Sequence, residues 1–381
     1  MRDVVILGST GSIGVQALEI IEANPHKFRV VALSAGGSQI DSLVEQARKF
    51  KVGVVGVRNN GDALRAALPG VTVIDGENAS TEIAAITADV VLNAITGSIG
   101  LAPTLSALSV GNVVALANKE SLVAGGDLVM KAAKPHQLLP VDSEHSALWQ
   151  AMAAGKKEEV SKFILTASGG AFRDRDDLSN VTLEEALTHP TWSMGPVVTI
   201  NSATLMNKGL EIIEAHYLFD MPYTKIEAVI HPQSIVHSLV EYVDGSTLAQ
   251  VSPPNMRGPI AYALQWPERL KSATAPINWD ATQQWSFSPI DSVKYPAIDL
   301  ARRCGEVGGG ATAIFNAANE VAVHAFIKGS IGFTSIIETV DEVVQKLGPS
   351  ASSSLRDLSD VSAIEENART VAAEVLKKWV A

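Results

Sequence analysis

The feature that most constrains the fold of this chain is a glycine-rich run between an apolar segment and a helical pattern. Residues 3–7 are apolar enough to form a strand buried on both faces, and Gly8-Ser-Thr-Gly-Ser-Ile-Gly14 follows directly. The helix predicted next ends near Asn24-Pro25. A strand, a glycine turn and a helix in this order are typical of the first βαβ unit of a nucleotide-binding domain; an ordinary glycine turn is the alternative.

Strand and helix patterns alternate through the first part of the chain. A helical pattern such as 38–50 separates several apolar runs. The runs that predict further strands are 29–33, 52–57, 71–74, 90–94 and 113–117. This alternation predicts an α/β fold in which residues 1–142 form a Rossmann-like, doubly wound, largely parallel domain.

The pattern changes after residue 142, and we expect two more domains. The strand-like runs that follow are 162–167, 196–200, 228–230, 235–242 and 247–251. Fewer helices separate them, so residues 143–265 are predicted to form a central α+β catalytic domain. The Pro- and Trp-rich residues 266–296 predict a linker. Residues 297–381 predict a C-terminal helical bundle, with helical patterns near 297–303, 311–328, 333–347 and 362–380.

Charge and cysteine content limit the partners and the compartment. The net charge of -11 argues against nucleic acid or an anionic membrane as the main partner, because both require a basic surface. The single cysteine, Cys304, cannot form an internal disulfide, which fits a reducing compartment. A strand already begins by Val4, so we expect no signal or transit segment and a cytoplasmic location.

The glycine spacing and the end of the second strand indicate the cofactor. Glycines at Gly8, Gly11 and Gly14 let the backbone approach a pyrophosphate at a helix N-terminus. An NAD site usually carries an acidic residue at the end of the second strand, but here no acid occurs before Asp41. NADPH is therefore predicted rather than NADH.

Two carboxylates, Asp142 and Glu144, stand two residues apart after an apolar stretch. If this segment is extended, both side chains point the same way and can hold Mg²⁺ or Mn²⁺. The alternative is a solvated acidic loop.

Lys119 and Glu120 follow the strand that ends at residue 117, so they are expected at the sheet edge where such folds bind ligands. The alternative is that they only form a solvated loop.

A second group of polar residues lies on a predicted helix that runs through Phe219. Asn207 and Glu211 share one face of it, with Lys208 beside them, and Ser202 is expected near its start, where free N–H groups suit a phosphate. A plain surface ion pair is the alternative. Ser168-Gly-Gly170 offers further donors, and residues 189–195 mix aromatic, hydroxyl and glycine residues as a closing lid would; a structural turn is the alternative there.

Six ordered motifs together resemble those of the 1-deoxy-D-xylulose 5-phosphate reductoisomerase family, over essentially the whole chain. They are the runs 8–14, Ala117-Asn-Lys-Glu-Ser121, Val141-Asp-Ser-Glu-His-Ser146, His189-Pro-Thr-Trp-Ser-Met-Gly195, Ser202-Ala-Thr-Leu-Met-Asn-Lys-Gly-Leu-Glu211 and His231-Pro-Gln-Ser-Ile-Val-His237.

The resemblance implies a role for each residue. The implied metal ligands are Asp142, Glu144 and Glu211. The residues implied to grip the substrate phosphate are Ser168, Ser202, Asn207 and Lys208. Those implied to contact the substrate hydroxyls are Ser143, Lys119 and Asn207, and Glu144 is counted with the substrate-binding residues. The implied flap residues are His189, Trp192 and Met194, with Lys119 and His189 also counted as catalytic. The NADPH site is implied to include Thr10, Gly11, Ser12, Ile13, Gly36, Glu120 and Gly195, and we add Gly8, Gly37, Ser38 and Asn118.

The cofactor site departs from the family at one point. Some members have Lys-Asn after the equivalent of Gly36, where this chain has Gly37-Ser38. Backbone N–H groups or Ser38 are therefore expected to contact the 2′-phosphate. The family also forms homodimers, which implies the same state for this chain.

The implied reaction is NADPH-dependent conversion of 1-deoxy-D-xylulose 5-phosphate to 2-C-methyl-D-erythritol 4-phosphate in the non-mevalonate isoprenoid pathway. We expect a metal-chelated retro-aldol/aldol rearrangement followed by hydride transfer, with a concerted 1,2-shift as the alternative. Two other functions are weighed against it. One is another NADP-dependent dehydrogenase, for example of a semialdehyde; such an enzyme would require a nucleophilic cysteine, and Cys304 lies in the wrong context. A non-catalytic nucleotide sensor would not need Asp142, Glu144 and Glu211.

Overall fold

A computed structural model describes residues 1–192 and 194–379, and its contacts divide the chain into two compact units. The first unit comprises Met1–Ser121, Val129–Ser146 and Asn255–Ala275, and the second comprises Leu122–Leu128, Ala147–Pro254 and the chain from Pro276 onward. Ser193, inside the predicted lid, and residue 380, inside the last predicted helix, lie outside the described residues.

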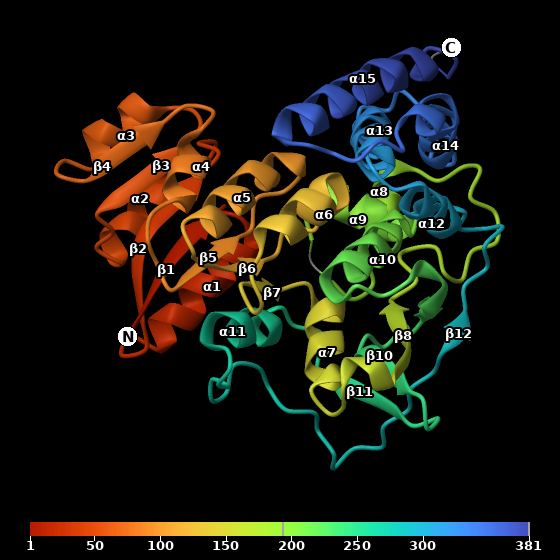
Figure 1. Ribbon diagram of the computed structural model, residues 1–381, viewed down its shortest axis with the longest axis horizontal. Helices are drawn as coiled ribbons and strands as arrows, with labels where there is room; N and C mark the ends of the chain where they lie inside the picture. The colour runs from red at the N-terminus through yellow and green to blue at the C-terminus, as the bar shows by residue number, and fades with distance from the viewer. Residues whose placement is uncertain (193, 380–381) are drawn as a thin grey trace. The chain divides into compact units, whose positions relative to one another are not determined.

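The first unit contains a parallel seven-stranded sheet in the order β4-β3-β2-β1-β5-β6-β7 (Figure 1). The strands are β1 (Arg2–Leu7), β2 (Phe28–Ala35), β3 (Val54–Val57), β4 (Thr72–Asp75), β5 (Val90–Asn93), β6 (Val113–Leu116) and β7 (Leu138–Pro140). The chain moves outward from β1 to β4 and then returns to β5 on the other side of β1. This reversal is the switch point of a doubly wound sheet, which confirms the predicted Rossmann-like fold.

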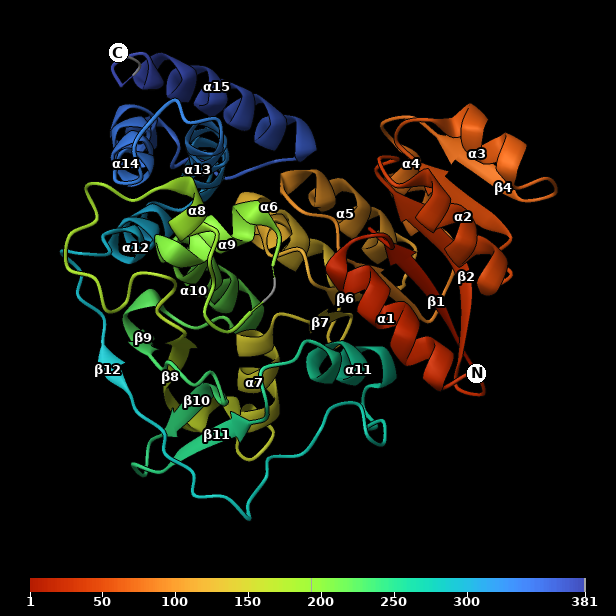
Figure 2. The same cartoon turned by 180° about the vertical axis from the view of Figure 1, so that it is seen from behind.

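Helices cover both faces of this sheet. They are α1 (Ser12–Ala23), α2 (Ile40–Lys49), α3 (Gly61–Ala67), α4 (Ala79–Ala84) and α5 (Leu101–Ser109), with the 3₁₀ turn η1 (Ser98–Gly100). The next helix, α6 (Glu120–Ala132), is divided between the two units. A later helix, α11 (Arg257–Gln265), lies beside α1 and reaches β6 and β7 (Figure 2). Central strands such as β1 are fully buried over Val4–Leu7, as expected for apolar runs enclosed on both faces.

The second unit contains a mixed five-stranded sheet in the order β11-β10-β8-β9-β12. Its strands are β8 (Val160–Ala167), β9 (Ile226–Ile230), β10 (Val236–Tyr242), β11 (Thr247–Val251) and β12 (Ser288–Pro289). The helices around the sheet are α7 (Ser143–Met152), which begins in the first unit, α8 (Leu183–Ala186), α9 (Pro196–Ala203) and α10 (Met206–Phe219), with the 3₁₀ turns η2 (Lys157–Glu159) and η3 (Tyr223–Lys225).

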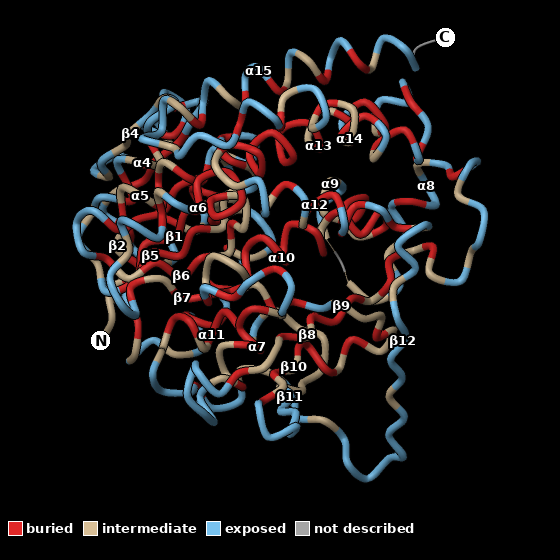
Figure 3. The backbone as a smooth tube through the Cα atoms, turned by 45° about the vertical axis from the view of Figure 1, so that its right-hand side comes forward, coloured by how far each residue is buried: buried red, intermediate tan, exposed pale blue. Residues whose placement is uncertain are grey.

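The C-terminal part of the second unit is helical, as predicted. Its helices are α12 (Ala297–Val307), α13 (Ala311–Ile327), α14 (Ser335–Leu347) and α15 (Leu358–Leu376), with the 3₁₀ turn η4 (Gly348–Ser350). The last three pack against one another, and α12 packs against α10. Residues 276–289 are mostly exposed, in contrast to these packed helices (Figure 3). The four-part domain division remains a prediction.

Two segments predicted to be extended are not. Residues 196–200 form the start of α9, not a strand. The β-branched run Val197-Val-Thr-Ile200 suggested a strand, but Pro196 at the first helical position after Gly195 starts a helix. Residues 142–144 are not extended either, because α7 begins at Ser143.

Candidate active site

The glycine turn after β1 requires its glycines. Gly8 has φ +77°, and a Cβ at Gly14 would lie 2.4 Å from the Gly8 carbonyl oxygen. Gly11 precedes α1 and brings no side chain to cap it, so the first-turn N–H groups at Ser12 and Ile13 are available to an anionic ligand. This is the geometry predicted for a nucleotide pyrophosphate site.

The end of β2 lies directly beside this turn. The backbone N–H groups of Gly8 and Ser9 both donate to the Ser34 carbonyl oxygen, at 2.9 Å. Gly37 has φ +98°, and a Cβ there would lie 2.3 Å from the Asn59 carbonyl oxygen. A side chain at position 37 is therefore strained and obstructed.

Asn118 organises the loops after β5 and β6. Its side-chain amide donates to the carbonyl oxygens of Ile95 (2.6 Å) and Gly97 (2.8 Å) and to the Glu120 carboxylate (2.9 Å). Asn118 is almost fully buried. The sequence assigned it to the cofactor site, and in the structure it holds Glu120 at the start of α6.

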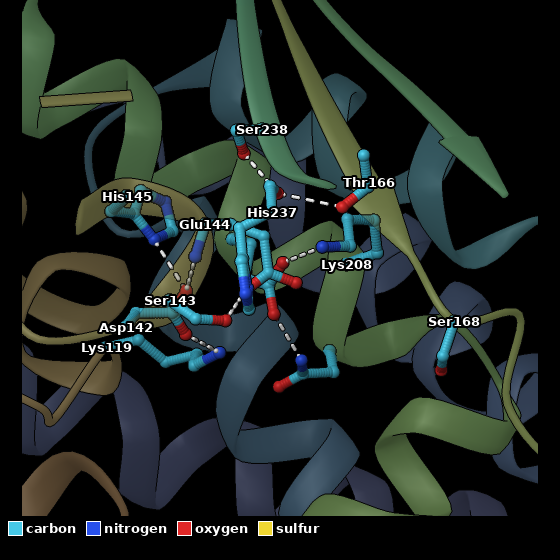
Figure 4. Close-up of polar contacts among 12 residues, drawn as sticks. Lys119, Asp142, Ser143, Glu144, His145, Thr166, Ser168, Lys208, His237 and Ser238 are labelled. Atoms are coloured by element: carbon cyan, nitrogen blue, oxygen red, sulfur yellow. Dashed lines mark hydrogen bonds and ion pairs between the residues drawn. The ribbon is translucent and has the colours of Figure 1, made fainter. Parts of the chain in front are cut away.

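Asp142 is the centre of a charged cluster in the first unit (Figure 4). Lys119 Nζ donates to one of its oxygens at 2.7 Å, and His145 Nδ1 lies 3.0 Å from the other. Burial alone would raise the pKa of Asp142, but the charges and hydrogen bonds of Lys119 and His145 outweigh it and hold that pKa well below its usual range. Asp142 is therefore ionised at neutral pH.

Asp142 also explains why the extended segment was wrongly predicted. The Glu144 N–H donates to the Asp142 carboxylate at 3.2 Å, so Asp142 acts as a cap for α7 and places Glu144 in its first turn. The two carboxylates still approach each other, with ligand oxygens within 4.8 Å. Ser143 Oγ donates to Glu144 at 2.5 Å.

A buried charged cluster occupies the first turns of α10 in the second unit. Lys208 and Asn207 both donate to the Glu211 carboxylate, as one face of a helix predicts, and Lys208 is labelled in Figure 4. Lys208 and Glu211 are only 3% and 1% exposed. The alternative of a surface ion pair is therefore wrong, because both charged groups are buried and depend on their partners for stabilisation.

The loop after β8, which begins at Ser168, packs against the part of α9 that carries Ser202. A Cβ at Gly170 (φ +64°) would lie 2.6 Å from the Ser202 carbonyl oxygen, so this loop packs against the end of α9. Ser202 lies near the C-terminal end of α9, not near a helix start as expected. The chain turns at Leu205 (φ +54°) before α10, and the sequence gives no glycine or proline to indicate that break.

His189 links the predicted lid to this serine loop. The N–H groups of Thr191 and Trp192 donate to its Nδ1 at 3.1 and 2.8 Å, so its proton lies on Nε2, 3.0 Å from Ser168 Oγ. Burial, followed by the charge of Arg173, lowers the pKa of His189 to about 4. The Trp192 ring meets His237 edge-on, with centroids 6.3 Å apart.

Arg173 is a residue that the sequence reasoning missed. Its guanidinium donates to the Ser168 carbonyl oxygen at 3.2 Å, which places a cation beside the serine loop. An arginine three residues after Ser168-Gly-Gly170 was the available signal.

His231, in the last motif, has a structural role. It is fully buried, and its Nε2 accepts from the N–H groups of Ile235 and Val236 at 3.1 Å.

Cys304 is unsuited to nucleophilic chemistry. Its side chain is 1% exposed, and burial raises the pKa of its thiol to about 12. The semialdehyde dehydrogenase alternative loses its nucleophile.

Among the described residues, no helix is both long and apolar enough to cross a bilayer.

Comparisons with known proteins agree over nearly the whole chain. Residues 4–126 match the profile of 1-deoxy-D-xylulose 5-phosphate reductoisomerase, and residues 138–219 and 251–371 match two C-terminal domain profiles of the same enzyme. The reductoisomerase of Streptomyces coelicolor is 52% identical, covering 98% of this chain and 92% of the relative. That of Leifsonia xyli subsp. xyli is 54% identical, covering 92% and 93%.

Solved structures give the same result. A crystal structure of the reductoisomerase in complex with NADPH, fosmidomycin and magnesium superposes with a TM-score of 0.94 at 39% identity, covering 99% of this chain and 98% of the other. The enzyme from Zymomonas mobilis in complex with NADPH gives 0.91 at 40% identity, covering 98% and 99%.

Proposed function

The chain belongs to the 1-deoxy-D-xylulose 5-phosphate reductoisomerase family, and from that premise we propose which of its residues carry out the family's reaction. The enzyme converts 1-deoxy-D-xylulose 5-phosphate to 2-C-methyl-D-erythritol 4-phosphate with NADPH, in isoprenoid biosynthesis. The observation that carries this function is the full-length match to enzymes of that name. The substrate is a 2-ketose phosphate whose skeleton rearranges to a branched aldehyde before reduction.

The metal is proposed to bind to Asp142, Glu144 and Glu211. The donor set consists only of carboxylate oxygens, which suits Mg²⁺ or Mn²⁺. The oxygens of Asp142 and Glu144 lie within 4.8 Å, and two ligands of one such ion lie about 4 Å apart or less, so a small side-chain rotation is sufficient. When bound, the ion supplies a Lewis acid that polarises the substrate ketone.

Lys119 is proposed to act on the substrate hydroxyls. Its ammonium already contacts Asp142 at 2.7 Å, and both side chains are largely buried, at 13% and 12% exposed. A fixed cation in such a dry environment can stabilise negative charge that develops on an oxygen during the rearrangement. Ser143, whose hydroxyl donates to Glu144, is proposed to contact a second substrate hydroxyl.

The substrate phosphate is proposed to bind to Ser168, Ser202, Asn207 and Lys208. The Ser168 oxygen accepts from the Gly170 N–H at 3.3 Å and lies beside the proton on His189 Nε2, so its own hydrogen can be donated to a phosphate oxygen. Holding the phosphate supplies remote binding energy that orients the reacting carbons.

His189, Trp192 and Met194 are proposed to form a flap over the substrate. The neutral His189 positions Ser168, and Trp192 supplies an apolar surface that excludes water.

NADPH supplies the hydride. Its site is proposed to comprise Gly8, Thr10, Gly11, Ser12, Ile13, Gly36, Gly37, Ser38, Asn118, Glu120 and Gly195.

A homodimer is also proposed, on the basis of an exposed sheet edge. Strand β11 lies at the edge of the second sheet, where unpaired backbone groups favour association. Leu248 on this strand is 40% exposed, and Val243 in the turn between β10 and β11 is 70% exposed. Sedimentation of the full chain should give twice the mass of one chain, and a monomer at all concentrations would contradict this. A cytoplasmic location is proposed as well, supported by the single buried cysteine.

The function is tested by following the loss of NADPH absorbance with 1-deoxy-D-xylulose 5-phosphate, with Mg²⁺ or Mn²⁺ added and again with excess EDTA. Oxidation that needs the metal, with 2-C-methyl-D-erythritol 4-phosphate as product, is expected. Oxidation that is insensitive to EDTA would remove the carboxylates from the mechanism. No oxidation with either metal would favour the nucleotide-sensor function.

A further inference from the structure

The structure assigns recognition of the 2′-phosphate of NADPH to Arg58, a residue outside all six sequence motifs; we propose that it sets the preference for NADPH over NADH. This inference rests on the proposed function, which supplies NADPH as the cofactor. It addresses the departure at Gly37-Ser38, where this chain offers no basic side chain at the tip of β2.

The ends of the neighbouring strands β1, β2 and β3 place Arg58 close to the end of β2. The Gly8 N–H donates to Ser34 in β2, which joins the pyrophosphate turn to the end of the second strand. The Arg58 N–H in turn donates to the Ala35 carbonyl oxygen at 3.2 Å, directly before Gly36. In doubly wound folds the ribose lies at the end of the second strand, so Arg58 is one strand further along the same edge.

The loop that carries Arg58 is fixed to the turn after β2. The Asn60 side chain donates to the Gly37 carbonyl oxygen at 2.9 Å. The Asn59 carbonyl oxygen occupies the space that a side chain at Gly37 would need. The backbone of the loop after β3 therefore excludes a basic residue at position 37. The same loop carries an arginine, Arg58.

The guanidinium of Arg58 can exchange its present partner for a phosphate. It contacts Glu77 at 3.2 Å, but the two side chains are 47% and 84% exposed, and such pairs contribute little. Arg65 on the next helix is held by two carboxylates, Asp62 and Asp75. A guanidinium binds a phosphate in a bidentate manner and loses less hydration than an ammonium.

The test is calorimetric binding to the full-length wild type and Arg58→Gln, with 2′,5′-ADP and 5′-AMP as probes and NADPH and NADH in parallel. Arg58→Gln should weaken 2′,5′-ADP and NADPH binding about tenfold or more, the usual effect of losing a charged hydrogen bond, and leave 5′-AMP and NADH unchanged. Arg58→Lys should restore part of the loss. Glu77→Gln should bind 2′,5′-ADP equally or more tightly.

Arg29→Gln is the matched control, because Arg29 is an exposed, ion-paired arginine on β2 that contacts Asp3 near the start of that strand, away from Gly36. It should bind all four probes as the wild type does. Equal 2′,5′-ADP affinity in wild type and Arg58→Gln, or an equal loss for NADPH and NADH, would overturn the role of Arg58 alone. A wild type that binds neither dinucleotide would overturn the proposed function as well.

Discussion

At the scale of single residues, two of the three carboxylates proposed to bind the metal are paired with a neighbouring lysine. Asp142 is paired with Lys119 and Glu211 with Lys208. Buried carboxylates without a compensating charge are strongly unfavourable, so these lysines offset the cost of burying the two carboxylates. Lys208 therefore has two proposed partners, Glu211 and the substrate phosphate.

Lys208→Ala should weaken capture of the phosphorylated substrate. Losing one charged contact to the phosphate is expected to raise KM by roughly 10- to 100-fold. Steady-state kinetics measure this, with Lys157→Ala as control, because Lys157 is an exposed lysine of the same unit paired with Asp220. An unchanged KM would remove Lys208 from the phosphate site.

His189 should titrate far below the ordinary value of 6.5. Its pKa in the folded chain is about 4, so between these two values the unfolded chain binds a proton that the folded chain does not. Stability should therefore fall as pH decreases from about 6.5 to about 4. Urea unfolding across this range should show a weaker pH dependence in His189→Gln than in wild type.

His26→Gln, a substitution at an exposed histidine, is the matched control variant. An imidazole pKa near 6.5 for His189, measured by NMR, would contradict the hydrogen-bonded arrangement with Ser168.

At the scale of elements, the strand–turn–helix at the start of the chain depends on Gly14. Gly14→Ala would place a methyl group 2.4 Å from the Gly8 carbonyl oxygen, and the forced backbone shift should cost about 1–3 kcal/mol. Gly36→Ala meets nothing within 4 Å and serves as the matched control. The urea midpoint should fall for Gly14→Ala only; equal midpoints would contradict the close packing at this turn.

The sequence predicted these elements unequally, for physical reasons. Apolar runs such as that of β1 are buried on both faces, and their pattern alone identifies them. Residues 196–200 have strand-forming side chains, yet a proline at the helix start and packing against α10 and α13 make them helical. Ser202 and Asp142 remain predicted site residues, and their local geometry depends on contacts that periodicity does not encode.

At the scale of the whole molecule, the residues proposed to bind the metal come from distant parts of the sequence. Asp142 and Glu144 flank the start of α7, whereas Glu211 lies on α10. Motif order could identify this set through resemblance to a family. Arg58 could not be identified in this way, because its role follows from strand order and from the backbone contacts of Ala35 and Gly37.

The central claim, that Asp142, Glu144 and Glu211 hold the catalytic metal, is tested most directly by titrating Mn²⁺ into wild type and Glu211→Gln and measuring bound ion by electron paramagnetic resonance. Glu211→Gln should bind Mn²⁺ about tenfold more weakly or worse and lose turnover, while NADPH binding is retained. Glu227→Gln, an exposed glutamate paired with Lys162, should behave as wild type. Unchanged Mn²⁺ affinity in Glu211→Gln, or equal loss of Mn²⁺ and NADPH binding, would contradict the claim.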